Sequence, residues 1–404
     1  MGNAYNTASL ILTPNGYKED IMYSVVPTDG GGDFSFTRAS SALRRNNAGL
    51  WESVDGKIPR LQYPVGGGCP SWLFEPERTN IVLESTSFID SGWAENSATL
   101  STSTDVSPIS GQVVTTIIST ASSLSGISRE VSGAAGKYSL QAFVKKRDLD
   151  FVAIIDITGG APSAWFNIGN GTLGTVETGY SATIDPEYNG FYKITLTRTG
   201  ANQTPFIFQL MFTNTDGSST GASGRTFLAY AGAELGISAS SPIITTDSTV
   251  TRAADSAIAT DGGGLIGQTE GVLYWEGACT SPTDLVGINK DFNNGLYIAK
   301  GSNSLYRATI YANSVALNFA DIGIKNTLVK IALAYKSGDS ALFVNGAKIG
   351  ATNTTIFAFT DALYDVNLND DILVGSQPQL VDCVLLNDMR LSDAECIALT
   401  AIPV

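Results

Sequence analysis

The most informative absence from this sequence is histidine, because none of its 404 residues is one. Histidine is the commonest general base near neutral pH and a favoured ligand of zinc. Ser-His-Asp and Cys-His catalysis are therefore excluded, and only carboxylate-pair hydrolysis or lyase-type chemistry would remain. The sequence also lacks a run of about 18 apolar residues, so it predicts no membrane-spanning segment.

Charged residues are scarce, at 15% of the chain, against roughly 25% in an average soluble domain. Asp and Glu number 38 and Lys and Arg 24, which gives a net charge of −14. This balance argues against a nucleic-acid-binding surface and against adhesion to an anionic membrane, because both need clustered basic side chains. Polarity is carried instead by Ser, Thr, Asn and Gly, as in β-rich extracellular or virion proteins.

Cysteine is rare too, and the four cysteines, at positions 69, 279, 383 and 396, form no C-x-x-C metal or redox pair. Cys383 and Cys396 could pair, but buried free thiols are the favoured interpretation. The first twenty residues have no basic segment followed by a long apolar one, so we expect no secretory signal. A protein of this kind that works outside a cell would leave it by another route, such as release of virions by lysis.

Strand patterns dominate the sequence from end to end. Residues 328–336, LVKIALAYK, alternate in steps of two, which is typical of a half-buried strand. Residues 341–346, ALFVNG, follow a short turn, so the two segments predict a hairpin. The dipeptide Asn345–Gly346 then predicts a further tight turn, because both residues tolerate a positive φ.

Helix signal is confined to residues 391–402, where Ser392 and Glu395 form a capping box. Turn signals between the expected strands suit β-sandwiches rather than βαβ units. We therefore expect an all-β protein with two antiparallel β-sandwiches and one short C-terminal helix. The expected parts are a turn-rich N-terminal segment at 1–80, a first sandwich at 81–255 and a second sandwich at 256–404.

The segment FEPERTN, residues 74–80, is typical either of a catalytic loop or of a structural join between modules. Pro76 fixes its own φ and holds Glu75 in an extended conformation. Arg78 offers five donors in a rigid fork, which suits it to tying loop carbonyls and a carboxylate together. Asn80 can bond its own backbone in a turn. We expect these four residues to form a structural junction, with Arg78 partly buried where the N-terminal part meets the first sandwich.

Three parts of the chain resemble known families. Residues 36–54, FTRASSALRRNNAGLWESV, and 69–93, CPSWLFEPERTNIVLESTSFIDSGW, resemble a segment that recurs in bacteriophage virion proteins, especially tail and head fibres. Residues 233–257, AELGISASSPIITTDSTVTRAADSA, resemble the end of the carbohydrate-binding-like β-sandwich that accompanies it. Residues 330–350, KIALAYKSGDSALFVNGAKIG, look like a concanavalin A-like or laminin G-like lectin domain. These resemblances imply sandwiches of jelly-roll or lectin-like type, with a carbohydrate-binding-like sandwich at 81–255 and a concanavalin A-like or laminin G-like one at 256–404. The resemblance to virion proteins also favours a structural role for residues 74–80.

Two sets of residues are weaker candidates for a catalytic or ligand site. Glu75 and Glu77 lie at i and i+2, about 7 Å apart on an extended chain, and we expect them to be solvated and without a general acid. Four aromatic residues could offer a ring face to a sugar, although aromatic residues in sandwiches more often lie in the core. These are Trp93, Trp165, Tyr274 and Trp275.

A third candidate is a calcium loop. Asp365, Asn367 and Asn369 supply alternating oxygen ligands, like the start of an EF-hand loop. The match then fails, because Asp370 and Ser376 stand where that loop needs Gly and Glu. A solvated turn is favoured over a looser calcium site, and the sequence predicts no cofactor.

The resemblance implies a non-enzymatic structural protein of a phage particle, a fibre or decoration subunit that binds a host-surface glycan. Its expected partners are other virion proteins and copies of itself, with a homotrimer the favoured arrangement. The expected location is the virion surface, on tail or head, after synthesis in the bacterial cytoplasm. A lectin or adhesin without a virion role is the first alternative, and a polysaccharide depolymerase the second.

Overall fold

The computed structural model describes residues 2–89, 91–134, 136–156, 164–200, 205–260, 264–279, 282–289, 293–301, 305–319, 323, 328–369 and 377–402. Within these residues the fold is almost entirely β, with short helices α1 (Gly2–Asn6) and α2 (Asp393–Thr400). The prediction of an all-β protein with a C-terminal helix is confirmed. The Ser392 hydroxyl accepts a hydrogen bond from the backbone N–H of Glu395, and the Glu395 carboxylate accepts one from the backbone N–H of Ser392, so the predicted capping box is present.

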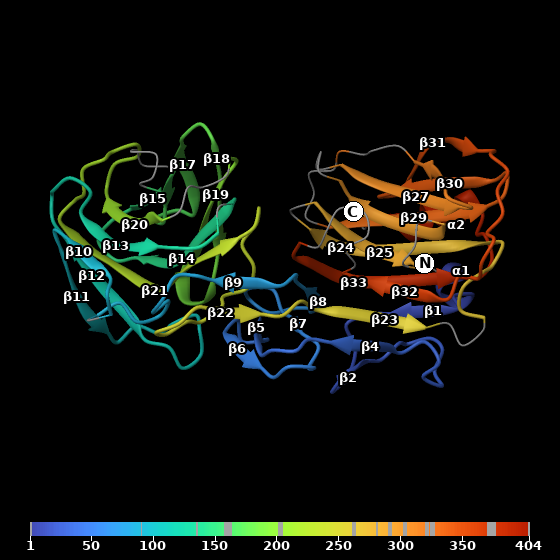
Figure 1. The fold of residues 1–404 in the computed structure, drawn as a ribbon, viewed down its shortest axis with the longest axis horizontal. Helices are drawn as coiled ribbons and strands as arrows, with labels where there is room; N and C mark the ends of the chain where they lie inside the picture. Colours follow the sequence, from blue (N-terminus) through green and yellow to red (C-terminus); the bar gives the residue numbers. More distant parts are fainter. Residues whose placement is uncertain are drawn as a thin grey trace.

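Figure 1 shows two lobes, each a pair of facing antiparallel sheets. We call the lobe at the left the first sandwich. One of its sheets has the order β10 (Ala94–Asn96), β13 (Gly126–Val131), β20 (Phe206–Thr213), β15 (Phe151–Asp156), β16 (Ala164–Asn167), β17 (Thr172–Val176). The other, which we call the groove sheet, has the order β11 (Ala98–Ser103), β12 (Val114–Ser119), β21 (Gly224–Leu235), β14 (Tyr138–Lys146), β19 (Tyr192–Arg198), β18 (Tyr180–Pro186). Their inward-facing residues form one hydrophobic core.

The lobe at the right is the second sandwich. One of its sheets has the order β31 (Ala347–Asn353), β30 (Ser340–Val344), β29 (Val329–Lys336), β24 (Glu270–Cys279), β33 (Gln379–Asn387), β8 (Ser71–Phe74), β7 (Leu61–Gln62). The facing sheet has the order β2 (Tyr17–Lys18), β3 (Ile21–Met22), β4 (Phe34–Thr37), β23 (Ser256–Thr260), β32 (Asp365–Leu368), β25 (Thr283–Ile288), β26 (Asn294–Lys300), β27 (Tyr306–Ala312), β28 (Val315–Asn318). The predicted hairpin is β29–β30, and Asn345 and Gly346 both have positive φ at the turn into β31.

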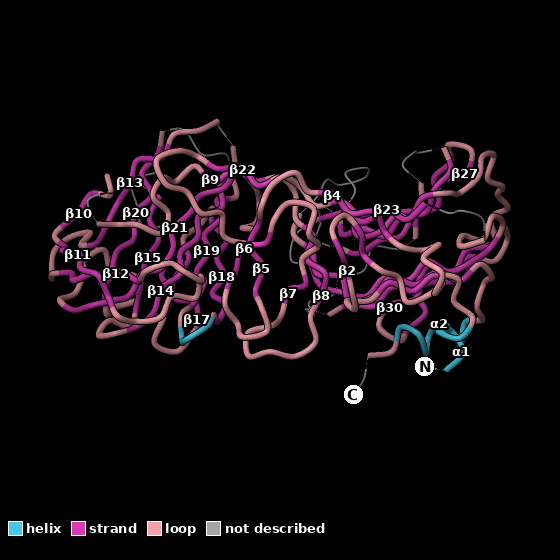
Figure 2. The backbone as a smooth tube through the Cα atoms, turned by 90° about the horizontal axis from the view of Figure 1, so that it is seen from below, coloured by secondary structure: helices cyan, strands magenta, loops and turns pink. Residues whose placement is uncertain are grey.

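Strand β29 differs from its prediction in burial. The alternation in 328–336 predicted one exposed face, yet every residue of β29 except Lys336 is buried. Its inner face, with Ile331 and Leu333, lies in the core between the sheets. Its outer face, with Ala332 and Ala334, is covered by residues of the two terminal helices. Figure 2 shows those helices close together on one side of the second sandwich.

The first 80 residues are distributed over both sandwiches. Strands β2, β3, β4, β7 and β8 extend the two sheets of the second sandwich, and β1 (Leu10–Leu12) pairs with β33. Strand β9 (Arg78–Asn80) pairs instead with β21 and with β22 (Val250–Arg252) beside the first sandwich. The hairpin β5 (Ala42–Arg45)–β6 (Trp51–Val54) packs on the outer face of the groove sheet, where Trp51 meets Phe143 and Tyr230. Apolar residues of this segment are thus buried within the same chain, and their burial needs no second subunit.

Candidate functional site

A cluster of buried charges lies where the N-terminal segment meets both sandwiches, and Glu75 is at its centre. The side chain of Glu75 is 2% exposed. Its Oε2 accepts from Arg60 Nη1 at 2.6 Å and lies 2.8 Å from Arg252 Nη1, while Ser241 donates to Oε1 through its backbone and to Oε2 through its hydroxyl. Burial acts to raise the pKa of Glu75, but the charges of Arg252 and Arg60 and the Ser241 hydrogen bond outweigh it, so the pKa is lowered. Glu75 is therefore ionised, and both of its carboxylate oxygens have hydrogen-bond partners.

The same cluster, which we call the junction network, includes Asp255 and Arg38. Asp255 pairs with Arg38 Nη1 at 2.9 Å and with Arg60 through its other oxygen. The Asp255 backbone N–H donates to the Glu75 carbonyl, and the Glu75 backbone N–H donates to the Asp255 carboxylate, both at 2.9 Å. The network thus joins residues that are far apart in sequence. Arg38 and Arg252 belong to the similar segments FTRAS and VTRAA, and both are almost fully buried here.

The other residues predicted at the junction are also in structural positions. Pro76 is buried, and its carbonyl accepts from Arg252 Nη2 at 2.6 Å. Asn80 is fully buried: it donates to the Ile243 carbonyl and accepts from two backbone N–H groups. Arg78 is half-buried and donates to the Glu77 carbonyl and to Gln377 Oε1, a residue of the second sandwich rather than the first. Glu77 is exposed, so the expectation that Glu75 and Glu77 are both solvated is wrong for Glu75.

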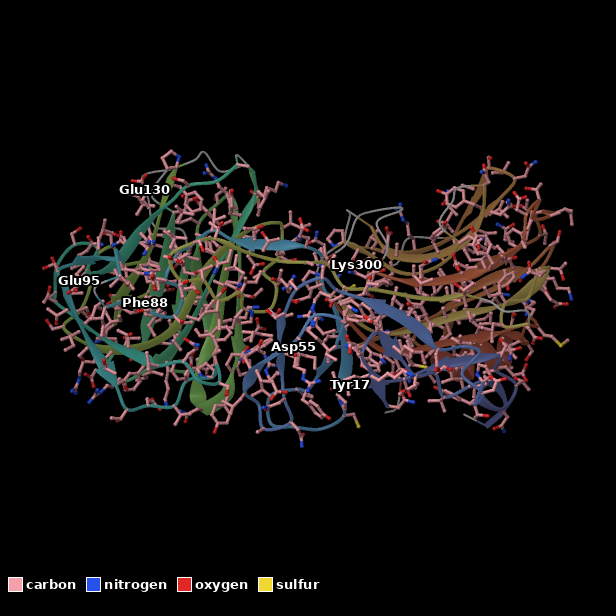
Figure 3. The ribbon with its side chains drawn as sticks, turned by 60° about the horizontal axis from the view of Figure 1, so that its bottom comes forward. Tyr17, Asp55, Phe88, Glu95, Glu130 and Lys300 are labelled. Carbon is pink, nitrogen blue, oxygen red and sulfur yellow. The ribbon has the colours of Figure 1, made fainter. Side chains whose placement is uncertain are left out.

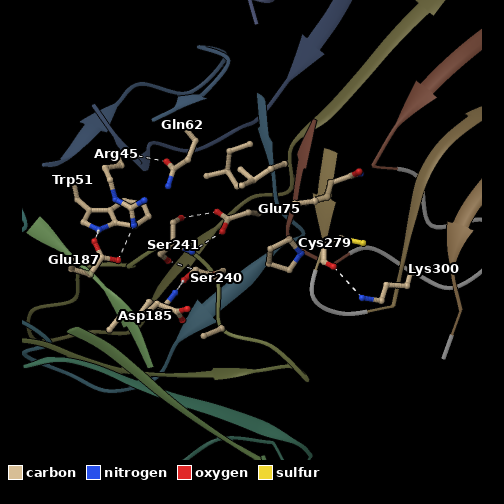
Figure 4. A pocket seen from close by; sticks show the side chains of 17 residues that line it. Arg45, Trp51, Gln62, Glu75, Asp185, Glu187, Ser240, Ser241, Cys279 and Lys300 are labelled. Carbon is tan, nitrogen blue, oxygen red and sulfur yellow. Dashed lines mark hydrogen bonds and ion pairs between the residues drawn. The ribbon is translucent and has the colours of Figure 1, made fainter. Parts of the chain in front are cut away.

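Beside the junction network lies a cavity of about 530 Å³, shown in Figure 4. The cavity lies where all three parts of the chain meet, and ligand pockets are common at such interfaces. The N-terminal segment supplies Arg45, Trp51 and Gln62. The first sandwich supplies Asp185, Glu187 and Lys193, the following loop Ser240 and Ser241, and the second sandwich Cys279, Lys300, Gln379 and neighbouring apolar residues.

One wall of the cavity is a fixed unit of three side chains. Arg45 Nη2 lies 2.8 Å from Glu187 Oε1, and Trp51 Nε1 donates to Glu187 Oε2 at 3.1 Å. The Arg45 guanidinium also stacks on the Trp51 ring, 4.8 Å from its centre, and Phe143 approaches the same ring. Burial raises the pKa of Glu187, against the opposing charges of Arg45 and Lys193. Trp51 therefore supports the wall but has no open ring face for a sugar.

The rest of the cavity lining offers polar groups that are fixed in position. Ser240 donates through its backbone and its hydroxyl to Glu234 Oε2, and Arg252 holds both Ser240 and Ser241. Gln62 uses its side-chain oxygen to accept from the Arg45 backbone, and its amide nitrogen is turned toward the cavity in Figure 4. Lys193 donates to the Ser240 carbonyl at 2.9 Å. The cavity thus combines donors and acceptors with apolar wall area, which suits a polyhydroxylated ligand.

A second hollow, of about 570 Å³, continues from this cavity over the outer face of the groove sheet. The two share three lining residues, Asp185, Lys193 and Ala239. We call the continuous depression the junction groove. Its second part is lined on the groove sheet by Ser181, Thr183, Thr195 and Thr197, and on the other side by residues 237–239 and by Pro282 of the second sandwich.

The carboxylates of the junction groove are not arranged for hydrolysis. Both oxygens of Glu75 and of Glu187 are held by fixed donors, which leaves neither group free to deliver or take up a proton. Asp185 is exposed and accepts from the Thr183 hydroxyl at 3.2 Å. The geometry supports binding better than the paired-carboxylate mechanism.

The four aromatic residues considered as sugar platforms all lie in hydrophobic cores. Trp93, Trp165 and Trp275 are 6%, 2% and 0% exposed, and Tyr274 is 0% exposed. Trp275 packs between the sheets of the second sandwich, and Tyr274 on the outer face beneath the terminal helices. A ring without an exposed face cannot stack on a sugar at the surface, so the core alternative that the sequence favoured is the one that the structure shows.

The residues considered for calcium lie in or beside a strand rather than in a solvated turn. Asp365 and Asn367 belong to β32, in the middle of its sheet, and Asp365 accepts from the Thr260 hydroxyl. Asn369 donates to the backbone carbonyls of Glu75 and Asp255, so it is another support of the junction network. Asp370 and Ser376 lie outside the described residues. Across the described parts of the chain, no cluster of three or more Cys, Asp or Glu is placed to hold a metal ion.

Two further sequence-based questions have structural answers. All four cysteines are free thiols: Cys69 is exposed and Cys279, Cys383 and Cys396 are buried. Burial raises the pKa of Cys383 and of Cys396, the latter to about 12. Neither of the described helices is long and apolar enough to cross a membrane.

Comparison with known proteins identifies no relative in sequence: no family model matches, and no curated protein matches. Among solved structures, the CBM40 of a Ruminococcus gnavus sialidase, bound to sialyllactose, has 15% identity and a TM-score of 0.29 over 34% of this chain and 84% of its own. A tandem CBM22 domain from Paenibacillus barcinonensis has 10% identity and a TM-score of 0.27 over 76% of this chain and 97% of its own. Domains LG4-5 of mouse laminin α1 have 9% identity and a TM-score of 0.23 over 77% of this chain and 94% of their own. Similarity at this level carries no functional argument.

Proposed function

We propose that the protein is a non-catalytic glycan-binding protein and that the junction groove holds the glycan. The observation that carries this proposal is the composition of the groove, which lies between the two sandwiches and presents hydroxyl, amide, amino and carboxylate groups beside apolar wall area. Sugar hydroxyls both donate and accept hydrogen bonds, so such a mixed lining matches them. Glu75 and Glu187 are held in ion pairs with Arg252 and Arg45, which supports binding without hydrolysis.

The finer proposal is that this binding serves a bacteriophage particle, in which the chain is a fibre or decoration subunit that contacts a host-surface glycan. It is supported by the resemblance of residues 36–54 and 69–93 to virion fibre segments. We extend the proposal to other virion proteins as partners and to a homotrimer. Immunogold labelling of the intact particle and mass measurement of the purified chain test these two points. Absence of label, or a monomer within the particle, contradicts them.

A microarray of bacterial surface polysaccharides tests glycan binding directly. We expect the wild-type chain to bind at least one polysaccharide, and Asp185→Asn combined with Lys193→Gln to weaken that binding at least tenfold. The matched controls are Glu130→Gln and Lys137→Gln, which likewise neutralise one carboxylate and one lysine elsewhere on the first sandwich; Figure 3 labels Glu130 far from the junction. Equal binding by the groove and control variants would place the site elsewhere.

The same array separates binding from depolymerisation. Incubation of the purified chain with the bound polysaccharide should release no new reducing ends, because neither buried carboxylate of the groove is free to transfer a proton. If reducing ends are released and the Asp185→Asn variant still releases them, a catalytic site lies outside the groove. If the variant no longer releases them, the catalytic site lies inside the groove.

A further inference from the structure

The outer face of the groove sheet carries an ordered row of hydroxyl groups that leads into the cavity. Strands β18 and β19 are antiparallel and place Ser181 opposite Thr197 and Thr183 opposite Thr195. The next opposed pair on the same face is Asp185 and Lys193, which belong to both parts of the groove. The three pairs follow one another along the strands, and we call them the hydroxyl ladder.

The ladder is long compared with one sugar ring. Successive positions on one face of a strand are about 7 Å apart, so three of them span about 14 Å. The two hollows together exceed roughly 1,000 Å³, the upper end of the usual range for a small-molecule pocket. A single monosaccharide would leave most of this space to water.

The chemistry of the ladder also suits a chain of sugars. The Thr195 hydroxyl makes no hydrogen bond with any described residue, although it lines the groove. Thr183 and Asp185 are exposed and bonded to each other, and Thr197 shares a hydrogen bond with the buried Ser139. Each rung thus keeps donor or acceptor capacity at a position fixed by the sheet. None of the described residues that line this second part of the groove is aromatic, so the ligand would be held by its hydroxyl groups.

We infer that the junction groove binds an internal stretch of a linear polysaccharide, several sugar units long, with its chain running along β18 and β19 and one part of it in the cavity beside Arg45 and Glu187. This inference rests on the proposed function, because it specifies the class of glycan that the same groove takes. It excludes recognition of a single terminal sugar. Opposite walls come from the first and the second sandwich, so the bound stretch contacts both.

The experiment measures binding of mono-, di-, tetra- and hexasaccharide fractions, prepared by partial hydrolysis of the polysaccharide that binds on the microarray, by isothermal titration calorimetry. We expect affinity to rise at least tenfold from the disaccharide to the hexasaccharide. In the double variant Thr183→Val, Thr195→Val, the hexasaccharide should bind no more tightly than the disaccharide binds to wild type. Valine is close in shape to threonine and favours strands, so the sheet is retained, which a thermal melt verifies.

The matched control is Thr99→Val, an exposed threonine on β11 at the opposite edge of the same sheet. It should keep the full dependence on chain length. Two outcomes overturn the inference while the proposed function stands: a monosaccharide that binds as tightly as the hexasaccharide, or an unchanged length dependence in the double variant. If no polysaccharide binds the wild-type chain at all, the proposed function fails, and the inference fails with it.

Discussion

Replacement of Glu75 by glutamine removes one charge from the centre of the junction network and changes little else. The amide keeps the size of the carboxylate, but one of its two ends becomes a donor. Glu75 Oε1 accepts from Ser241, and Oε2 accepts from Arg60 and Ser241 and faces Arg252. Either orientation of the amide therefore turns an –NH₂ group toward groups that also donate.

The expected cost follows from burial. Arg60, Arg252 and Glu75 have side chains that are 0–2% exposed, so water cannot replace the lost acceptor. Removal of one partner from a buried ion pair typically costs about 3–5 kcal/mol. That is a large part of the roughly 5–15 kcal/mol that keeps a protein domain folded. We expect Glu75→Gln to unfold at a clearly lower urea concentration, followed by tryptophan fluorescence and far-UV circular dichroism.

The cost should also depend on pH. The pKa of Glu75 is lowered in the folded protein, so its stabilising effect is present above the ordinary glutamate pKa of about 4.3. That effect is lost as the pH falls through the lower folded-state pKa. The difference between wild type and Glu75→Gln should therefore be full at pH 7 and begin to shrink below about pH 4.

The neighbouring Glu77 supplies the control. It is exposed, and substitutions at such positions usually change stability by no more than about 0.5 kcal/mol. Glu77→Gln makes the same chemical change two residues away and should unfold like wild type. If Glu75→Gln and Glu77→Gln unfold at the same urea concentration, the junction network does not hold the sandwiches together as described.

Four further outcomes are expected, the first three measured by urea unfolding. Glu234→Gln should cost less than Glu75→Gln at pH 7, because burial raises the pKa of Glu234 and already disfavours its charged form; an equal cost would contradict this. Asn80→Ala should cost at least about 1–3 kcal/mol, because it leaves buried backbone groups unpaired, and wild-type stability would refute it. Arg78→Ala should cost about 1–3 kcal/mol through the loss of its bonds to Glu77 and Gln377, and an unchanged midpoint would show that Arg78 is not part of the junction. Ellman's reagent should modify Cys69 alone in the native protein and all four thiols in urea; fast reaction of a second native thiol would disprove the burial.

The sequence predicts the strands well because alternation is a local property. Alternation along residues 272–275 puts Leu273 with Trp275 and Val272 with Tyr274, and the structure has the same two faces. It did not predict that both faces are buried, because the cover over Tyr274 comes from helices at the two ends of the chain. Burial of that face depends on contacts across several hundred residues, which no local pattern records.

The partners within the junction network were also out of reach of local sequence patterns. The composition of FEPERTN predicted a structural join, but the residue that dominates it is Glu75 rather than Arg78. Its partner Arg60 is 15 residues away and its partner Ser241 is 166 residues away. Two other members of the network do share a sequence feature, because Arg38 and Arg252 occupy matching places in the similar segments FTRAS and VTRAA. Glu187, the buried acid of the cavity wall, gave no signal at all.

The junction network and the junction groove share residues, and this links stability to binding. Glu75, Ser240 and Ser241 line the cavity while their side chains are fixed by Arg60 and Arg252. A wall fixed before the ligand arrives loses little conformational entropy when the ligand binds, so more of the interaction energy remains as affinity. The network also joins the two sandwiches whose surfaces form opposite sides of the groove, so it sets the width between them. A substitution that loosens the network, such as Glu75→Gln, should therefore weaken glycan binding even where most of the protein remains folded.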